Sequence, residues 1–339
     1  MEIADNALGK RPSMARPHWV AVILSLFVWG LGSQASRADS DGPPPDIAAK
    51  IAALGPVVNG PATAAIYGPL QKGCKDHPAI LRDLAYGQDP DNLADVFVPS
   101  VPHASAAPVL IFVHGGGYTG GARRLGPDSP FYDNVGQWAA CHGFIGINMT
   151  YRRAPRGMWP AAADDVGAAV AWVRQNVAQW RGDPDRIFLM GHSAGATHVA
   201  SYIADPHLWR GPAAPVRGAI IISGSFDVGD PQAAPVEDRP YITKAQSYYG
   251  TDASVWPTQS SVPGLVKSDI PLLFVNAAFD PPYFHRQAAM LAAAMGSAQR
   301  GRDRFVTLVG HDHMSEVFSI NAGDDSLTRQ ILTFVKDQK

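Results

Sequence analysis

Short stretches that are apolar throughout alternate with amphipathic stretches along most of the chain. The stretches VLIFV, FIGIN and IFLMG predict strands that are buried on both faces, and GAIIISG, PLLFVNAAF and RFVTLVGHD predict three more. Between them, residues 162–180 carry valines at helical spacing, and SLTRQILTFVKD predicts a last helix. Continuous apolar strands separated by helices favour an α/β fold with a doubly wound, mostly parallel sheet.

The first 38 residues have a different pattern from the rest. Lys10, Arg11 and Arg16 precede the apolar stretch 19–32, and residues 36–38 (SRA) place small residues at both recognition positions of a signal peptidase. This is typical of a secretory signal peptide, and we expect cleavage after residue 38. The alternative is a membrane anchor, but the apolar stretch is shorter than the ~20 residues that cross a bilayer. We therefore expect an exported protein, periplasmic or secreted, without stable membrane insertion.

The remainder of the chain predicts one domain with an N-terminal extension. Residues 39–80, rich in Pro, Ala and Gly, are expected to form an N-terminal extension, and residues 81–339 the α/β domain. No repeat or linker divides that domain. Residues 225–268 form its longest irregular stretch, with several tyrosines and a tryptophan, and we interpret them as a small cover over the site.

Composition narrows the classes of partner. The chain has 339 residues, 46% of them hydrophobic, and a formal net charge of −2, so its charge does not favour a nucleic-acid partner. Its two cysteines, Cys74 and Cys141, could pair in an exported protein, but a buried free thiol suits Cys141 as well, and we expect no disulfide. The sequence does not indicate an oligomeric state.

The motif GHSAG, residues 191–195, lies between a predicted strand and a predicted short helix. In that context Gly-x-Ser-x-Gly is typical of a nucleophile elbow, a strained turn that lifts the serine hydroxyl to the edge of the sheet. We expect Ser193 to be the nucleophile and the amide of Ala194 to lie at a helix N-terminus. Glycines flank the serine because a Cβ there would clash with neighbouring backbone.

A serine hydroxyl needs a base to remove its proton, and the base needs an orienting acid. In this architecture the order along the chain is serine, acid, histidine. Asp280 follows a predicted strand and is the expected acid, whereas a turn or cap role suits the rival, Asp227, better. The last strand leads to His311 and His313, and spacing leaves both open as the base. Asp312 between them is expected to form the turn.

The sequence HGGG, which follows another predicted strand, predicts a loop that stabilises the oxyanion of a serine hydrolase. The tetrahedral intermediate has an oxyanion, which is stabilised by backbone amides from a glycine-rich loop and from the residue after the nucleophile. We expect Gly116 and Gly117 to provide these amides beside Ala194. A phosphate-binding loop is excluded because no Lys-Ser/Thr pair or GxGxxG spacing follows. His114 is expected to brace the loop and His192 to be structural.

The motifs HGGGYTGG, TYRRAP, GHSAGA and DHM resemble the α/β-hydrolase superfamily, on its carboxylesterase and hormone-sensitive-lipase side. A closer similarity, carried by DPPYFHRQ and DDSLTRQILTF, is to the arylformamidase (kynurenine formamidase-like) branch. The resemblance covers about residues 80–339 and implies Ser193, Asp280 and His313 as the catalytic triad.

These motifs favour an enzyme that hydrolyses small carboxylic esters without a cofactor or metal. An amidase or formamidase with the same triad is the alternative, and a non-catalytic binding module is a third class, although no triad candidate is missing. The HxH pair lacks the further ligands of a metal site. The aromatic residues expected to line an apolar substrate pocket are Tyr118, Phe226, Tyr283 and Phe284.

Overall fold

The computed structural model describes residues 42–73, 77–101, 105–211, 215–229, 234–297 and 303–338. The expected signal peptide lies outside these residues. Residues 40–339 cluster as one compact unit.

Within the described residues, eight strands form one sheet in the order β1-β2-β4-β3-β5-β6-β7-β8. β2 runs antiparallel to β1 and β4, and all other neighbours are parallel, as the apolar stretches predicted. The strands are β1 (Ala79–Ala85), β2 (Leu93–Val98), β3 (Ala107–Val113), β4 (Ile145–Met149), β5 (Gly182–His192), β6 (Gly218–Ile222), β7 (Leu272–Phe279) and β8 (Arg304–Asp312).

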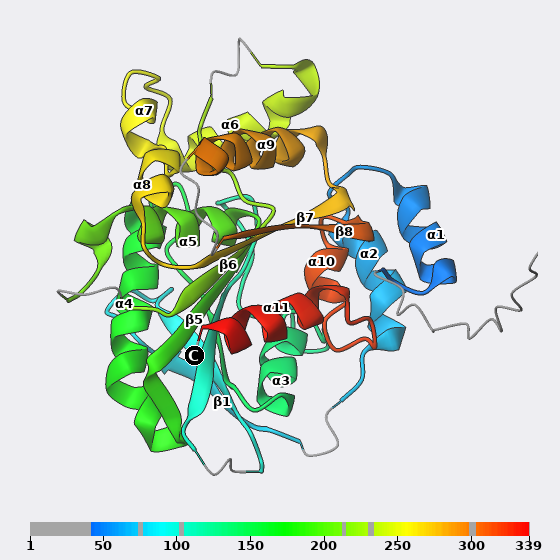
Figure 1. Ribbon diagram of the computed structural model, residues 1–339, viewed down its shortest axis with the longest axis vertical. Helices are drawn as coiled ribbons and strands as arrows, with labels where there is room; N and C mark the ends of the chain where they lie inside the picture. The colour runs from blue at the N-terminus through cyan, green and yellow to red at the C-terminus, as the bar shows by residue number, and fades with distance from the viewer. Residues whose placement is uncertain are drawn as a thin grey trace, which may run out of the picture. The chain divides into compact units, whose positions relative to one another are not determined.

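Helices cover both faces of this sheet (Figure 1). They are α1 (Pro45–Leu54), α2 (Gly60–Tyr67), α3 (Asp133–Cys141), α4 (Ala161–Asn176), α5 (Ala194–Ala204), α6 (Arg239–Tyr249), α7 (Trp256–Gln259), α8 (Val262–Lys267), α9 (Pro282–Ser297), α10 (Ser315–Phe318) and α11 (Ser326–Asp337). Short 3₁₀ turns are η1 (Gly68–Leu70), η2 (Val177–Trp180), η3 (Pro206–Leu208) and η4 (Val236–Asp238).

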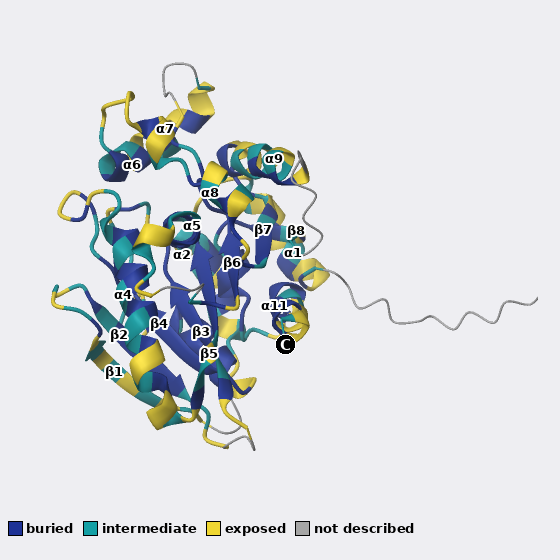
Figure 2. Ribbon diagram, turned by 60° about the vertical axis from the view of Figure 1, so that its left-hand side comes forward, coloured by how far each residue is buried: buried dark blue, intermediate teal, exposed yellow. Residues whose placement is uncertain are grey.

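Strand β3 shows why the sheet needs helices on both sides. Its odd-numbered residues, such as Ile111, join a core with α4 and α5, whereas Leu110 and Phe112 join a second core with α3 and α11. Successive side chains of a strand point to opposite faces, so a strand that is apolar throughout must be buried on both. The central strands are accordingly buried, while the edge strand β1 alternates between exposed and half-buried residues (Figure 2).

The cover, residues 225–268, is more regular than expected, because it contains α6, α7 and α8. Helix α6 has Pro240 in its first turn and ends at Gly250, whose φ is 85°; both are favourable boundary residues. Its buried residues do recur at helical spacing, but Tyr248 and Tyr249 are among them, and their hydroxyls weaken the apolar pattern.

The N-terminal extension is helical and packs against the end of the sheet. Helix α1 contacts β8 and α2 contacts α10. The hydroxyl of Thr63 in α2 donates a 2.7 Å hydrogen bond to Asp312, and the hydroxyl of Tyr67 donates one of 3.2 Å to Asp324. Two buried hydrogen bonds therefore attach the first helices to the last part of the chain.

The expectation of a free thiol is wrong for Cys141. This residue ends α3, is exposed, and is disulfide-bonded. The other cysteine of the chain, Cys74, lies outside the described residues. An exposed position at a helix end is accessible to a partner thiol, which the apolar neighbours of Cys141 in the sequence did not reveal.

In the part of the chain that the structure describes, the helices are all too short or too polar to cross a bilayer.

Candidate active site

Ser193 occupies the sharp turn between β5 and α5. Its φ is 56° and its ψ −122°, a conformation that is rare for a residue with a side chain. Its amide donates a 2.8 Å hydrogen bond to Ile222 O on the neighbouring strand, which holds the turn against the sheet. A Cβ on Gly195 would lie 2.1 Å from Val113 O, so only glycine lets the helix start this close to β3. The turn leaves Ser193 half-buried, at the edge of a cavity.

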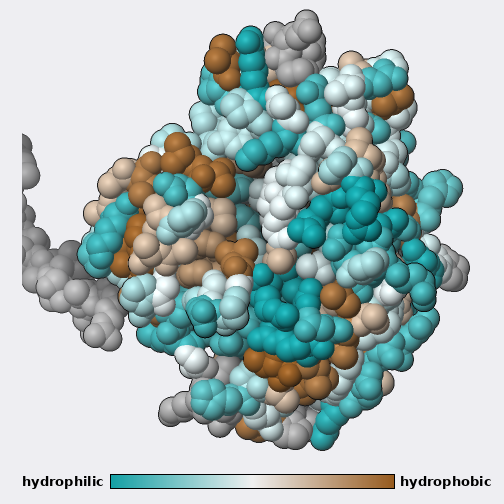
Figure 3. All heavy atoms as spheres, turned by 180° about the vertical axis from the view of Figure 1, so that it is seen from behind, coloured by the Kyte–Doolittle hydropathy of each residue, from teal (hydrophilic) through white to brown (hydrophobic). Residues whose placement is uncertain are grey.

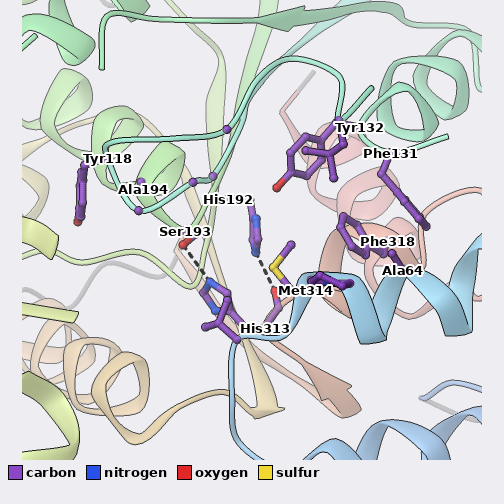
Figure 4. A pocket seen from close by; sticks show the side chains of 18 of the residues that line it. Ala64, Tyr118, Phe131, Tyr132, His192, Ser193, Ala194, His313, Met314 and Phe318 are labelled. Carbon is purple, nitrogen blue, oxygen red and sulfur yellow. Dashed lines mark hydrogen bonds between the residues drawn. The ribbon is translucent and has the colours of Figure 1, made fainter. Parts of the chain in front are cut away.

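His313 lies within hydrogen-bond distance of both Ser193 and Asp280. Its Nε2 is 2.9 Å from Ser193 Oγ, and its Nδ1 is 2.7 Å from Asp280 Oδ1 (Figure 4 shows the first of these bonds). Because a carboxylate only accepts, Nδ1 carries the proton and Nε2 is left to accept from the serine hydroxyl. The ring of Phe284 stacks on the imidazole, with centroids 4.3 Å apart. These contacts fix both the tautomer and the orientation that a general base requires.

Asp280 is buried but well provided with donors. Its Oδ2 accepts from Ser223 Oγ at 2.5 Å, from the amide of Ala277 at 3.0 Å and from Asn276 Nδ2 at 3.2 Å. Burial by itself raises the pKa of Asp280, but the hydrogen bonds from His313, Ser223 and Ala277 outweigh it and hold the pKa below its ordinary value. The acid therefore stays ionised beside His313.

A second buried carboxyl group, Glu316, stands behind Asp280. Ser223 Oγ lies 2.9 Å from Glu316 Oε1 as well as 2.5 Å from Asp280 Oδ2. A hydroxyl has one proton, so it donates to one of these carboxyl groups and must accept from the other. Burial, and then the charge of Asp280, raise the pKa of Glu316 well above its ordinary value. Glu316 is thus the protonated partner, and the hydrogen bonds run from Glu316 to Ser223 to Asp280.

The glycine loop after β3 lies against the nucleophile. A Cβ on Gly115 would be 3.0 Å from the Cβ of Ser193, and one on Gly116, whose φ is 143°, would be 2.2 Å from Gly120 O. Gly117 has a φ of 61°. The amides of Gly116, Gly117 and Ala194 make no hydrogen bond within the described residues, and all three residues line the cavity at Ser193. Three residues with free amides thus line the same cavity as Ser193.

Ser193 opens into a cavity of about 510 Å³. Phe131, Tyr132, Phe318, Met314 and Ala64 lie on one side of the serine and Tyr118 on the other (Figure 4). Figure 3 shows one face of the molecule, where the surface is hollowed beside a group of hydrophobic residues. The lining is therefore mostly apolar, with Ser193 and His313 among its few polar residues.

Comparison with known proteins finds relatives that are named esterases. The family model BD-FAE matches residues 94–206. Esterase LipQ of Mycobacterium tuberculosis is 32% identical over 249 residues, which are 70% of this chain and 58% of LipQ. Esterase LipC of the same organism is 28% identical over 243 residues, which are 68% of this chain and 59% of LipC. The chain thus spans less than two thirds of the length of these curated relatives.

Solved structures share the fold. Esterase B from Lactobacillus rhamnosis has a TM-score of 0.65 at 18% identity, over 86% of this chain and 96% of that one. A truncated carbohydrate esterase from gut microbiota has a TM-score of 0.65 at 17% identity, over 79% of this chain and 99% of that one.

The chain has the fold of these esterases, and its sequence is similar to the α/β-hydrolase superfamily. The similarity is to the carboxylesterase and hormone-sensitive-lipase-like side of that superfamily, as the sequence motifs implied. The closer similarity to the arylformamidase branch stays a prediction.

The structure distinguishes the two histidines that follow the last predicted strand. His311 does not reach Ser193; its Nδ1 is 3.2 Å from Ser315 Oγ and its Nε2 3.5 Å from Asp324 Oδ2. Asp312 accepts from the amides of Met314 and Ser315, at 3.1 and 2.7 Å, and so forms the turn that spacing predicted.

The rival acid, Asp227, is not brought to His313. Its backbone is held by Gln287, which accepts from the amide of Asp227 at 3.1 Å and donates to its carbonyl at 3.0 Å. Gln287 also accepts from the amide of Phe226 at 2.8 Å. The glutamine of the motif DPPYFHRQ therefore anchors the loop that follows β6, a role that its position in the sequence did not indicate.

The two other histidines near the site support the backbone. His114 Nδ1 lies 2.7 Å from Gly115 O, and its ring stacks on Tyr151, whose hydroxyl donates to His114 O at 2.7 Å. His192 Nε2 lies 2.8 Å from His313 O. Burial lowers the pKa of His114 to about 4, and burial followed by the neighbouring His313 lowers that of His192 to about 3. Both stay neutral and brace the glycine loop and the base.

The predicted substrate residues divide into two pairs. Tyr118 and Phe284 line the cavity, but Phe226 and Tyr283 do not, and that part of the prediction is corrected. Phe226 is buried against Phe274, with ring centroids 6.0 Å apart, and Tyr283 stacks on Tyr241 at 5.4 Å. Proximity in sequence to Asp227 and Asp280 suggested the wrong pair, because side-chain direction, rather than position along the chain, decides what a cavity contacts.

One group of side chains has potential metal ligands within 4.8 Å of one another, namely His192, His313 and Glu316. Both ring nitrogens of His313 already bond Asp280 and Ser193. A cation there would have to replace the hydrogen bonds of the base, so the arrangement is better suited to proton transfer.

Proposed function

We propose that the protein is a serine hydrolase of carboxylic esters that works through an acyl-enzyme. The observation that carries the proposal is the continuous hydrogen-bond chain from Asp280 through His313 to Ser193, at 2.7 and 2.9 Å, ending at a cavity. The names of the relatives, Esterase LipQ and Esterase LipC, support the ester as the bond that is cleaved.

In the first half-reaction Ser193 Oγ attacks the ester carbonyl carbon while His313 Nε2 takes the hydroxyl proton. The new imidazolium is stabilised by ionised Asp280. The oxyanion forms hydrogen bonds with the free amides of Gly116, Gly117 and Ala194. When the C–O bond breaks, His313 returns the proton to the leaving alcohol and the acyl group stays on Ser193.

The second half-reaction repeats these steps with water. His313 removes a proton from a water molecule, whose oxygen attacks the acyl carbon, and the same three amides stabilise the second oxyanion. Collapse of this intermediate releases the carboxylic acid, and the proton on His313 returns to Ser193 Oγ. The mostly apolar cavity wall favours contacts with the hydrocarbon portion of the acyl or alcohol part.

The test uses p-nitrophenyl esters of increasing chain length beside N-formylkynurenine and aryl amides. We expect ester hydrolysis, a loss of about 10⁴-fold or more in Ser193→Ala, and labelling of the wild type but not of this variant by an organophosphate. Hydrolysis of the formyl or aryl amides in preference to every ester would favour the amidase alternative. Activity near the wild-type level in Ser193→Ala would exclude the triad.

The oxyanion donors need a test of their own. Gly117→Ala places a Cβ at a φ of 61° and 3.2 Å from Lys244 Cδ, whereas a Cβ on Gly116 would clash with backbone. We expect the loss to fall on kcat, by about 10²–10³-fold if one donor is displaced, with KM little changed. A variant with normal kcat and a lower melting temperature would show that the glycine serves the turn alone.

We also propose that the protein is exported with cleavage after residue 38, on the basis of the basic residues and the short apolar stretch before that point. Expression of the full chain in a Gram-negative host should give a periplasmic protein that begins at Asp39. Full-length chain in the membrane fraction would instead favour the anchor.

A further inference from the structure

Apart from the histidines, one side chain with an ionisable nitrogen lines the cavity at Ser193 in the described part of the chain. Among the described residues that line it, Lys244 is the single lysine, and there is no arginine, aspartate or glutamate. The remaining lining residues are glycines, aromatic and aliphatic residues and a few hydroxyl groups. A negatively charged substrate group would therefore meet one cation and no carboxylate there.

Lys244 projects from α6 of the cover across the glycine loop. A Cβ built on Gly117 would lie 3.2 Å from its Cδ and 3.8 Å from its Nζ. The ammonium group thus lies close to Gly117, which lines the same cavity as Ser193. An anion a few bonds from the scissile carbonyl would come within reach of it.

Within the described residues, the ammonium group also has no carboxylate partner. Many cations of the protein are paired with carboxylates, for example Arg152 with Asp165 and Arg286 with Asp238, but no carboxylate in the described part of the chain lies within 4 Å of Lys244 Nζ. Exposed ion pairs gain little because water and salt screen them. Lys244 is itself exposed, so water and salt screen this attraction in part, but it is the one cation that a bound carboxylate would meet among the described lining residues.

We propose that Lys244 forms an anion subsite, and that the preferred substrates are esters with a carboxylate a few bonds from the scissile carbonyl, such as monoesters of dicarboxylic acids. This rests on the proposed ester hydrolysis. Lys244 acts on the choice of substrate: it binds the remote carboxylate while the triad and the glycine loop act on the ester group.

The test compares monoethyl esters of succinic, glutaric and adipic acid with analogues whose free carboxylate is replaced by a primary amide of the same size. Hydrolysis is followed by titration of the released acid. In the wild type, kcat/KM should be about 10-fold or more higher for at least one monoester than for its amide analogue, and the ratio should fall as salt is raised.

Lys244→Met should bring that ratio close to one, Lys244→Glu should invert it, and Lys244→Arg should restore much of it. Lys267→Met is the matched control, because Lys267 is an exposed lysine of α8 in the same cover that does not line the cavity. It should leave the ratio unchanged.

The outcomes separate the two proposals. If the amide analogues are hydrolysed but the wild-type ratio is near one, or Lys244→Met lowers both rates equally, the subsite is wrong and the esterase proposal stands. If neither series nor the p-nitrophenyl esters are hydrolysed, the esterase proposal fails and the subsite fails with it.

Discussion

His311 and His313 are two residues apart and equally buried, yet their surroundings differ completely. The ring of His313 connects an acid to a half-buried serine at the cavity. The ring of His311 lies near Ser315 and Asp324, away from the cavity lining. Neither residue type nor burial distinguishes the two. What differs is the partner on the far side of each ring, an activatable hydroxyl in one case and a structural hydrogen bond in the other.

The residues around each histidine extend the contrast. Behind His313, Ser223 and Glu316 supply hydrogen bonds that end on Asp280. Beside His311, Asp312 and Asp324 accept from hydroxyls of α2, which attach the N-terminal helices. The first neighbourhood is built for proton transfer and the second for holding the chain together, so substitutions in them should affect different measurements.

The largest effect is expected at the two histidines themselves. His313→Ala should lower kcat for ester hydrolysis by about 10⁴-fold, because the base is lost, whereas His311→Ala should keep most of the activity in the protein that remains folded. Steady-state kinetics on both variants would decide. A reversed result would move the base to His311 and leave the mechanism class intact.

A smaller loss of activity is expected behind His313. Ser223→Ala removes a donor from Asp280 and leaves the proton of Glu316 without its acceptor, so kcat should fall about 10–100-fold, as for other partners that orient a functional side chain. KM should change little, since Ser223 does not line the cavity.

Glu316→Gln is the informative companion, because its amide can still donate to Ser223. It should stay within a few-fold of the wild type, while Glu316→Leu, without a donor, should resemble Ser223→Ala. Equal losses in the glutamine and leucine variants would mean that Glu316 is not the donor that the hydrogen-bond geometry requires.

On the His311 side the effect should appear in stability. Thr63→Val keeps the shape of the side chain but removes its 2.7 Å hydrogen bond to buried Asp312. The free energy of unfolding should fall by about 1–2 kcal/mol, within the range for a buried group that loses a partner. Denaturant unfolding would measure this, and kcat of the folded variant should be close to the wild-type value. A stable variant with reduced kcat would contradict the division between the two neighbourhoods.

The smallest effect is a pH dependence. Burial lowers the pKa of His311, against the opposing charges of Asp324 and Asp312. Below about 6.5, the ordinary pKa of the unfolded residue, the unfolded chain binds a proton that the folded protein does not. Stability from this group is therefore present above that pH and lost as the pH falls.

The contribution of His311 to the free energy of unfolding changes by at most about 1.4 kcal/mol per pH unit. In His311→Asn the loss of stability between pH 6.5 and 5 should be shallower than in the wild type, with His142→Asn, on an exposed residue, as the control. If the free energy of unfolding falls equally steeply with pH in the wild type and in His311→Asn, His311 does not contribute to the acid sensitivity.

The sequence predicted the parts of the site that depend on short motifs. The elbow at Ser193, the glycine loop and the strand that precedes Asp280 are each local, and their patterns predicted where the sheet would place them. Between His311 and His313, by contrast, the spacing left both open, because the turn at Asp312 decides which ring faces the serine.

Other parts depend on contacts between distant segments. Ser223 and Glu316 are separated by 93 residues, and nothing near either one in the sequence indicates that they form a hydrogen bond. Phe131, Tyr132 and Ala64 line the cavity from loops and a helix that carry no motif. The disulfide of Cys141 was missed as well, since the residues next to Cys141 in the sequence are apolar and gave no sign that this position is exposed.

The attachment of α2 to the turn after β8 has a consequence for the order of events during synthesis. Thr63 and Asp312 are 249 residues apart, so this contact closes nearly the whole described chain into a loop. One wall of the cavity comes from the beginning of that loop, and His313 from its end. A nascent chain, even one with its elbow already folded, has neither the base nor a finished cavity. The complete site therefore forms only after β8 has been synthesised and has packed against α1 and α2.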